Sequence, residues 1–98
     1  MTRNKFITYI DTIKRIVKTI EFNSWTNRNS LDKKSYGSFY DISINILSET
    51  FDKKFHRDIF IDMFRVYQRD GRFTSEYDIN GVIVRTPIEL YDSVVTNN

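Results

Sequence analysis

The side chains that could carry out chemistry in this chain are few and scattered. His56 is the only histidine, and the sequence contains no cysteine. A general base that titrates near neutral pH therefore has one candidate, and a thiol nucleophile or thiolate metal site has none. Zinc and calcium sites need ligands clustered at fixed spacing, whereas the 13 carboxylates here are dispersed. We expect no metal site and no cofactor.

The tripeptide His56-Arg57-Asp58 is the sequence feature that most suggests catalysis, because protein kinases carry their catalytic base in such a triplet. Kinases also require a glycine-rich phosphate loop and a magnesium-binding motif, and this sequence has neither. His56 falls on the apolar arc of an expected helix. We therefore interpret it as a histidine at the edge of the core, bonded to a neighbouring backbone or tyrosine group, and expect that the protein is not an enzyme.

A subset of the basic residues provides candidates for binding phosphates or an acidic protein surface. They occur on three segments: Lys14, Arg15 and Lys18; Arg28, Lys33 and Lys34; Lys53, Lys54 and Arg57. If the segments converge they form one basic patch, and if they do not they are the solvated face of a small domain. The net charge of +2 is low for a dedicated nucleic-acid-binding domain. Trp25 and Tyr36 are aromatic candidates for stacking on bases or contacting a protein.

Residues 4-22 form the most periodic segment and are expected to be an amphipathic helix. Its apolar side chains alternate spacings of four and three: Phe6, Ile10, Ile13, Val17 and Ile20. This spacing suits a helix packed on its own domain and also the seam of a short coiled coil. Packing within the domain is favoured, because fewer than three heptads make a weak zipper, and a homo-oligomer through residues 6-20 is the alternative.

Residues 52-70 are expected to be a second long helix, with Asp52 as N-cap and Gly71 just past its end. The apolar arc is wide enough to predict a central, buried helix, and it includes Phe55, Ile59, Phe60, Met63, Phe64, Val66 and Tyr67. The opposite strip alternates acids and bases at helical spacing, which predicts salt bridges along the surface. This strip consists of Asp58, Asp62, Arg65 and Arg69.

The segment between these helices fits more than one structure. Residues 23-37 gather Asn, Ser, Asp, Lys and Gly, which predicts a long connection. Residues 38-51 form a third element, and within it 39-47 alternate apolar and polar side chains like a half-buried strand. The same segment fits a helix with Ser38 as N-cap and an apolar stripe at Tyr40, Ile44, Leu47 and Phe51. Helix is slightly favoured over strand.

The C-terminal quarter predicts a β-hairpin over 74-85 that leads into a short helix over 87-95. Asn80-Gly81 between two apolar runs is typical of a type I′ turn, in which both central residues have positive φ. The resulting register places Glu76 opposite Arg85 and one apolar face on the sheet: Tyr77, Ile79, Val82 and Val84. Thr86-Pro87-Ile88-Glu89 has the form of a capping box. Ile83 lies on the polar face and is a candidate contact for a partner.

These elements predict a small α+β domain that spans residues 1-98. Three helices followed by a hairpin is the order of a winged helix-turn-helix domain, with 72-85 as the wing. In such a domain the third helix and the wing should present basic or polar side chains to DNA. Here the third helix would present Asp58 and Asp62, and the wing tip has an acid and no base. This weakens the prediction of DNA binding.

The chain contains no alanine, one proline and three glycines, and it is rich in amino acids with A/T-rich codons. This composition suggests a gene from an A/T-rich genome, such as that of a phage or a mobile element. We expect a small binding protein that modulates or inhibits a host protein, in the cytoplasm and without a signal peptide or membrane span. A nucleic-acid-binding regulator with a winged-helix-like fold is the main alternative. A structural subunit of a larger assembly is a weaker one.

Overall fold

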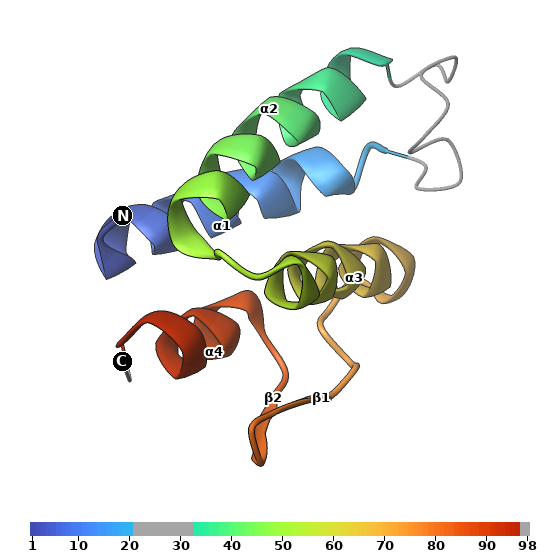
Figure 1. The fold of residues 1–98 in the computed structure, drawn as a ribbon. Helices are drawn as coiled ribbons and strands as arrows, with labels where there is room; N and C mark the ends of the chain where they lie inside the picture. Colours follow the sequence, from blue (N-terminus) through green and yellow to red (C-terminus); the bar gives the residue numbers. More distant parts are fainter. Residues whose placement is uncertain (21–32, 97–98) are drawn as a thin grey trace.

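A computed structural model describes residues 1–20 and 33–96 of the chain, and it contains helices and a two-stranded antiparallel hairpin (Figure 1). The elements follow one another as α1 (Arg3–Val17), α2 (Lys33–Thr50), α3 (Lys54–Asp70), β1 (Tyr77–Ile79), β2 (Val82–Val84), α4 (Pro87–Tyr91) and the π-helical turn η2 (Asp92–Thr96). The predicted α+β class is confirmed. None of the helices in the described ranges combines the length and the apolar character that crossing a membrane requires.

Helix α1 packs inside the domain through the predicted apolar stripe. Phe6, Ile10, Ile13 and Val17 are buried, and α1 lies alongside α2 (Figure 1). The side chains expected to form a coiled-coil seam are therefore covered by the chain itself, so in this conformation they are not available to a second copy. The helix ends at Val17 rather than at residue 22, because the amide and the hydroxyl of Thr19 both bond the Ile16 carbonyl, at 3.1 and 2.8 Å.

Helix α2 corrects the prediction for the middle of the chain. Residues 39-47 are helical, so the strand alternative is wrong, and the helix begins at Lys33 instead of after an N-cap at Ser38. The predicted connection 23-37 is therefore wrong over 33-37, and its earlier part lies outside the described residues. The buried stripe is Phe39, Ser43, Ile46 and Leu47. Ile44, predicted to belong to the stripe, is 42% exposed.

Helix α3 lies at the centre of the core, as predicted, and ends at Gly71 with the expected left-handed φ of 77°. The ring of Phe60 lies 5.1 Å from that of Phe64, 6.1 Å from that of Phe51 on the α2–α3 link, and 6.3 Å from that of Phe6 on α1. Two details differ from the prediction. The N-cap is Lys53 rather than Asp52, and no side chain caps the helix. The second difference is the exposure of Phe55, described below.

The hairpin has the predicted turn and register. Asn80 and Gly81 have φ values of 52° and 86°, and Ile79 pairs with Val82. The Asp78 carboxylate accepts a hydrogen bond from the Gly81 amide at 2.7 Å, which stabilises the turn. The predicted Glu76–Arg85 ion pair forms at 3.0 Å. The apolar face is shorter than predicted, because Val82 at its outer end is 52% exposed.

The C-terminal segment folds back onto the start of the chain. The Thr86 hydroxyl accepts from the Glu89 amide at 3.1 Å, which confirms the predicted N-cap of α4. Leu90 and Tyr91 are buried, and the Tyr91 hydroxyl donates to the Met1 carbonyl at 2.9 Å. This attachment holds η2 close to the junction of α2 and α3 and so forms one wall of a pocket.

Candidate functional site

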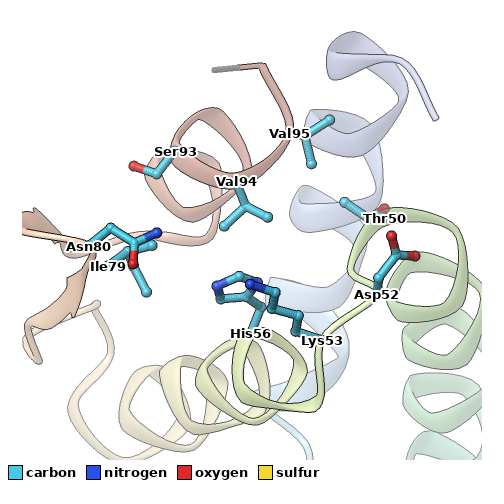
Figure 2. A pocket seen from close by; sticks show the side chains of 9 residues that line it. All are labelled: Thr50, Asp52, Lys53, His56, Ile79, Asn80, Ser93, Val94 and Val95. Carbon is cyan, nitrogen blue, oxygen red and sulfur yellow. The ribbon is translucent and has the colours of Figure 1, made fainter. Parts of the chain in front are cut away.

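A pocket of about 330 Å³ lies where the end of α2, the start of α3, the hairpin tip and η2 meet (Figure 2). This volume is at the lower end of small-molecule sites. The lining residues are Thr50, Asp52, Lys53, His56, Ile79, Asn80, Ser93, Val94 and Val95. The pocket therefore combines an apolar wall from the hairpin and η2 with polar groups from the α2–α3 junction.

His56 projects into this pocket from the first turn of α3 (Figure 2). Only 8% of its surface is exposed, and its ring lies 5.6 Å from that of Phe55 and 6.4 Å from that of Phe51. The position at the edge of the core agrees with the prediction. The expected neighbours do not, because the ring contacts phenylalanines rather than a tyrosine. Burial lowers the pKa of His56, and the positive charge of Lys53 lowers it further.

The start of α3 adds positive potential to the pocket. Lys53 lines the pocket beside His56, and its carbonyl accepts the amides of His56 and Arg57 at 3.1 and 3.3 Å. The amides of Lys54 and Phe55 come first in the helix, and no hydrogen bond to another described residue occupies them. These first-turn amides carry the positive end of the helix dipole. Asp52 is the acidic lining residue and lies on the α2 side, near Thr50 (Figure 2).

The pocket lacks the contacts that covalent or metal chemistry would use. Within residues 1–20 and 33–96, no three His, Cys, Asp or Glu side chains come close enough to hold a metal ion. The Thr50 hydroxyl donates weakly to the Met1 sulfur at 3.9 Å. Over the same residues, no hydrogen bond joins the His56 ring to the hydroxyl of Thr50 or Ser93, so the contact between base and nucleophile is not formed.

The predicted basic residues do not form one patch in the described part of the chain. Lys14 and Lys18 on α1 lie over the ring of Tyr67 near the end of α3, with ammonium-to-centroid distances of 6.0 and 5.6 Å. Lys54 forms an ion pair with Asp58 at the start of α3, at 2.7 Å. Thirteen residues separate Lys54 from Tyr67, which is about 20 Å along the helix. The two groups therefore lie at opposite ends of α3.

The Arg57 side chain is bonded to the backbone of its own chain. Its Nη1 donates to the carbonyl oxygens of Phe51 and Asp52, at 2.9 and 2.8 Å. These carbonyls belong to the link between α2 and α3, so the guanidinium fixes the angle at which α3 leaves α2. Sequence reasoning missed this role, because the acceptors are backbone groups that no residue type identifies.

The remaining predicted site residues are placed as follows. Arg15 is exposed on α1, and Lys33 and Lys34 begin α2. Tyr36 also lies in α2, whereas Trp25 and Arg28 lie outside the described residues. Arg15 is not among the residues that line the pocket.

Four large apolar side chains are exposed on the surface of the described residues: Phe55 at 58%, Val82 at 52%, Ile83 at 45% and Ile44 at 42%. Ile83 is the predicted one. Phe55 and Val82 were missed, because both were assigned to buried faces. The wide apolar arc predicted for α3 could have indicated that Phe55 is exposed. An apolar arc that covers more than half of a helix must leave one flank outside the core.

Asp62, on the charged strip of α3, has a structural partner in the hairpin. The Tyr77 hydroxyl of β1 donates a hydrogen bond to the Asp62 carboxylate, which ties the hairpin to the helix. Burial, together with this bond to Asp62, raises the pKa of Tyr77 to about 12. At the end of the helix, the Arg69 guanidinium and the Thr74 hydroxyl lower the pKa of Asp70 to about 2.

Comparison of the chain with models of protein families, with curated proteins and with solved structures finds no match in any of the three. The pocket, the exposed apolar side chains and the separated basic residues are therefore the features from which a function is argued.

Proposed function

We propose that the protein is a small non-catalytic binding protein that modulates or inhibits a protein partner. The observation that carries the proposal is the exposure of Phe55. Of the phenylalanines in the described residues, Phe6, Phe39, Phe51, Phe60 and Phe64 are fully buried and Phe73 is partly buried. Phe55 alone among them projects 58% of its surface into solvent. Aromatic side chains that are exposed in the free protein and buried in a complex dominate many interfaces.

The hairpin tip extends this apolar character. Val82 pairs with Ile79, which lines the pocket, and neighbouring strand residues point to opposite faces. Val82 therefore shares the pocket side of the hairpin, and Ile83 faces the other side. We call Phe55, Val82 and Ile83 the apolar rim, because each stands on an element that borders the pocket. Exposed apolar groups surrounded by polar residues are typical of protein interaction sites.

The composition of the chain supports the origin that we attach to this proposal. A gene rich in A/T codons is common in phages and mobile elements, and small proteins from such genes often act by occupying a host protein. The expected location is then the cytoplasm of the host cell. A site without a metal cluster or a base–nucleophile contact in the described residues fits an action by binding.

A nucleic-acid-binding regulator is the alternative, and the element order α1, α2, α3 and hairpin supports it. The charges weaken it. The exposed surface of α3 carries Asp58 and Asp62 as well as Arg65 and Arg69, and the candidate lysines Lys14, Lys18 and Lys54 are divided between the two ends of that helix. On the hairpin, Arg85 is paired with Glu76. A phosphate backbone would therefore meet no continuous basic strip on α3 or on the hairpin.

Affinity capture from the native cell, with and without nuclease, tests the proposal. We expect a protein partner that persists after nuclease treatment. Phe55→Ser and Ile83→Ser should each weaken its binding by about thirtyfold, as expected for the loss of an interface hot spot. Ile44→Ser is the matched control, because it removes an exposed isoleucine from α2, outside the rim. Equal binding by all three variants would contradict the rim as the interface.

A salt titration separates the two candidate functions. A nucleic-acid-binding protein loses affinity steeply as salt increases, because each neutralised phosphate releases counterions. We expect no binding to duplex DNA or RNA at about 50 mM salt. Measurable affinity with a steep negative salt slope would favour the alternative function.

A further inference from the structure

The pocket contains a largely buried histidine whose ring nitrogens are open to the cavity. More than nine tenths of the His56 surface is buried, and its ring points into the cavity (Figure 2). No hydrogen bond joins the ring to another residue of the described chain. The ring nitrogens can therefore bond a ligand or solvent group that enters the cavity.

Several hydrogen-bond donors surround the same cavity. Lys53 contributes an ammonium group beside the His56 ring, and Asn80 contributes an amide from the hairpin tip on the facing side (Figure 2). The uncapped N-terminus of α3 begins at this point, with the first two amides free of partners among the described residues. Helix N-termini and lysine ammonium groups both stabilise negative charge.

We propose that this pocket binds an oxyanion group, a phosphate or a carboxylate, that is attached to a small apolar body. The Lys53 ammonium, the His56 ring and the start of α3 would hold the anion. The apolar wall of Ile79, Val94 and Val95 would contact the rest of the ligand. The volume of about 330 Å³ is several times that of a phosphate group and leaves room for such a body. This proposal does not depend on the interaction of the apolar rim with a protein.

The charges that face the cavity permit this assignment. Of the nine residues that line it, Asp52 and Lys53 carry charges at neutral pH, and His56 is the one whose ordinary pKa lies near neutral pH. Thr50, Asn80 and Ser93, from α2, the hairpin and η2, are uncharged. The Asp52 carboxylate lies on the α2 side beside Thr50, away from the His56 ring (Figure 2). An anion placed next to Lys53 and His56 therefore meets the positive part of the cavity.

Binding of an anion should change the protonation of His56. In the free protein, burial and the adjacent Lys53 charge lower the pKa of His56. A bound anion favours the imidazolium form, so the pKa must rise when the site is filled. Because both changes are linked, the affinity for the anion should increase as the pH falls through the range in which His56 becomes protonated.

Proton NMR tests the proposal directly, because a chain with one histidine gives one set of imidazole signals. The full chain is titrated with inorganic phosphate, phenyl phosphate and benzoate at constant ionic strength, with sodium chloride as reference. We expect saturable shifts of the His56 signals and an upward shift of its pKa. Phenyl phosphate should bind more tightly than inorganic phosphate if the apolar wall contributes. Saturation by phenyl phosphate alone identifies phosphate as the ligand group, and saturation by benzoate alone identifies a carboxylate.

Two neighbouring lysines provide the matched variants. Lys53→Met should weaken binding about tenfold, because it removes a charge-assisted hydrogen bond. Lys54→Met should change the affinity less than twofold, because Lys54 is exposed, pairs with Asp58 and does not line the pocket. The proposal is refuted if no anion shifts the His56 signals beyond the chloride reference. It is also refuted if both lysine variants weaken binding equally, which would indicate a general effect of charge.

Discussion

Replacement of Arg57 by alanine provides the clearest test of how the α2–α3 junction is held. The guanidinium donates to two carbonyl oxygens of the link, those of Phe51 and Asp52, at 2.9 and 2.8 Å. Both bonds come from one nitrogen, and the side chain is half-buried, so their contributions are not independent. A hydrogen bond to a charged group contributes about 1.5–3 kcal/mol. We therefore expect Arg57→Ala to lower the free energy of unfolding by about 2 kcal/mol.

Chemical denaturation followed by circular dichroism measures this loss, and thermal melting should show a decrease of about 8–16 °C for a domain of this size. Arg57→Lys should recover part of the stability, because an ammonium group can still donate to a carbonyl. Lys54→Ala is the control. Its ion pair with Asp58 is exposed, and such pairs contribute less than about 1 kcal/mol. A loss below about 0.5 kcal/mol for Arg57→Ala would refute the structural role that we assign to this arginine.

Three further predictions concern the backbone and titratable groups. Gly81→Ala should destabilise the fold by about 1–2 kcal/mol, because φ is +86° at this position. Gly37→Ala should stabilise the fold by about 0.5–1 kcal/mol, because Gly37 lies inside α2 and nothing lies within 4 Å of an added Cβ. Chemical denaturation of both variants tests these changes. The pKa of Tyr77 is raised to about 12 from 10.0, so the stability that its neutral hydroxyl contributes is complete below pH 10 and is lost between pH 10 and 12. Alkaline unfolding curves of Tyr77→Phe should lack this loss of stability. The pKa of Asp70 is lowered to about 2 from 3.8, so the stability that its carboxylate contributes is present above pH 4 and is lost as the pH falls toward 2. Acid unfolding curves of Asp70→Asn should lack this loss of stability.

The elements that sequence predicts best here are those specified by local interactions. The turn at Asn80-Gly81 requires positive φ at two adjacent positions, and few other residue pairs tolerate it. The start of α4 depends on a threonine hydroxyl that reaches an amide three residues later. Each of these features involves residues close together in the chain, so residue type and spacing contain the necessary information.

Helix α2 shows where such information is insufficient. Alternation of apolar and polar residues over 39-47 fits a strand, and two helical stripes also fit the same residues. The choice is made by packing, because Phe39 and Ile46 belong to the core that α1 and α3 also form, and the ring of Phe39 lies 6.2 Å from that of Phe64 on α3. Ile44 then points outward, although its residue type favours burial as much as that of Ile46 does. Only the position of the neighbouring helices decides which of these isoleucines is inside.

The candidate pocket was not predictable for a related reason. Its lining comes from α2, α3, the hairpin and η2, and residues 50 and 95 at its edges are far apart in the chain. The sequence did single out His56 and Lys53, but on separate arguments about catalysis and basic charge. Their placement beside each other depends on the first turn of α3, and the wall opposite them depends on the bond between Tyr91 and the Met1 carbonyl.

The structure also changes how the positive charge of the chain should be interpreted. Lys14 and Lys18 lie over aromatic rings, and Lys54 pairs with a carboxylate. Arg57 bonds the backbone. These residues already interact within the molecule, so binding phosphates with them would require breaking contacts that stabilise the fold. Lys53 differs, because it points into a pocket beside a buried histidine. A basic site that consists of one lysine, one histidine and a helix N-terminus suits a single anionic group better than the repeated phosphates of a nucleic acid.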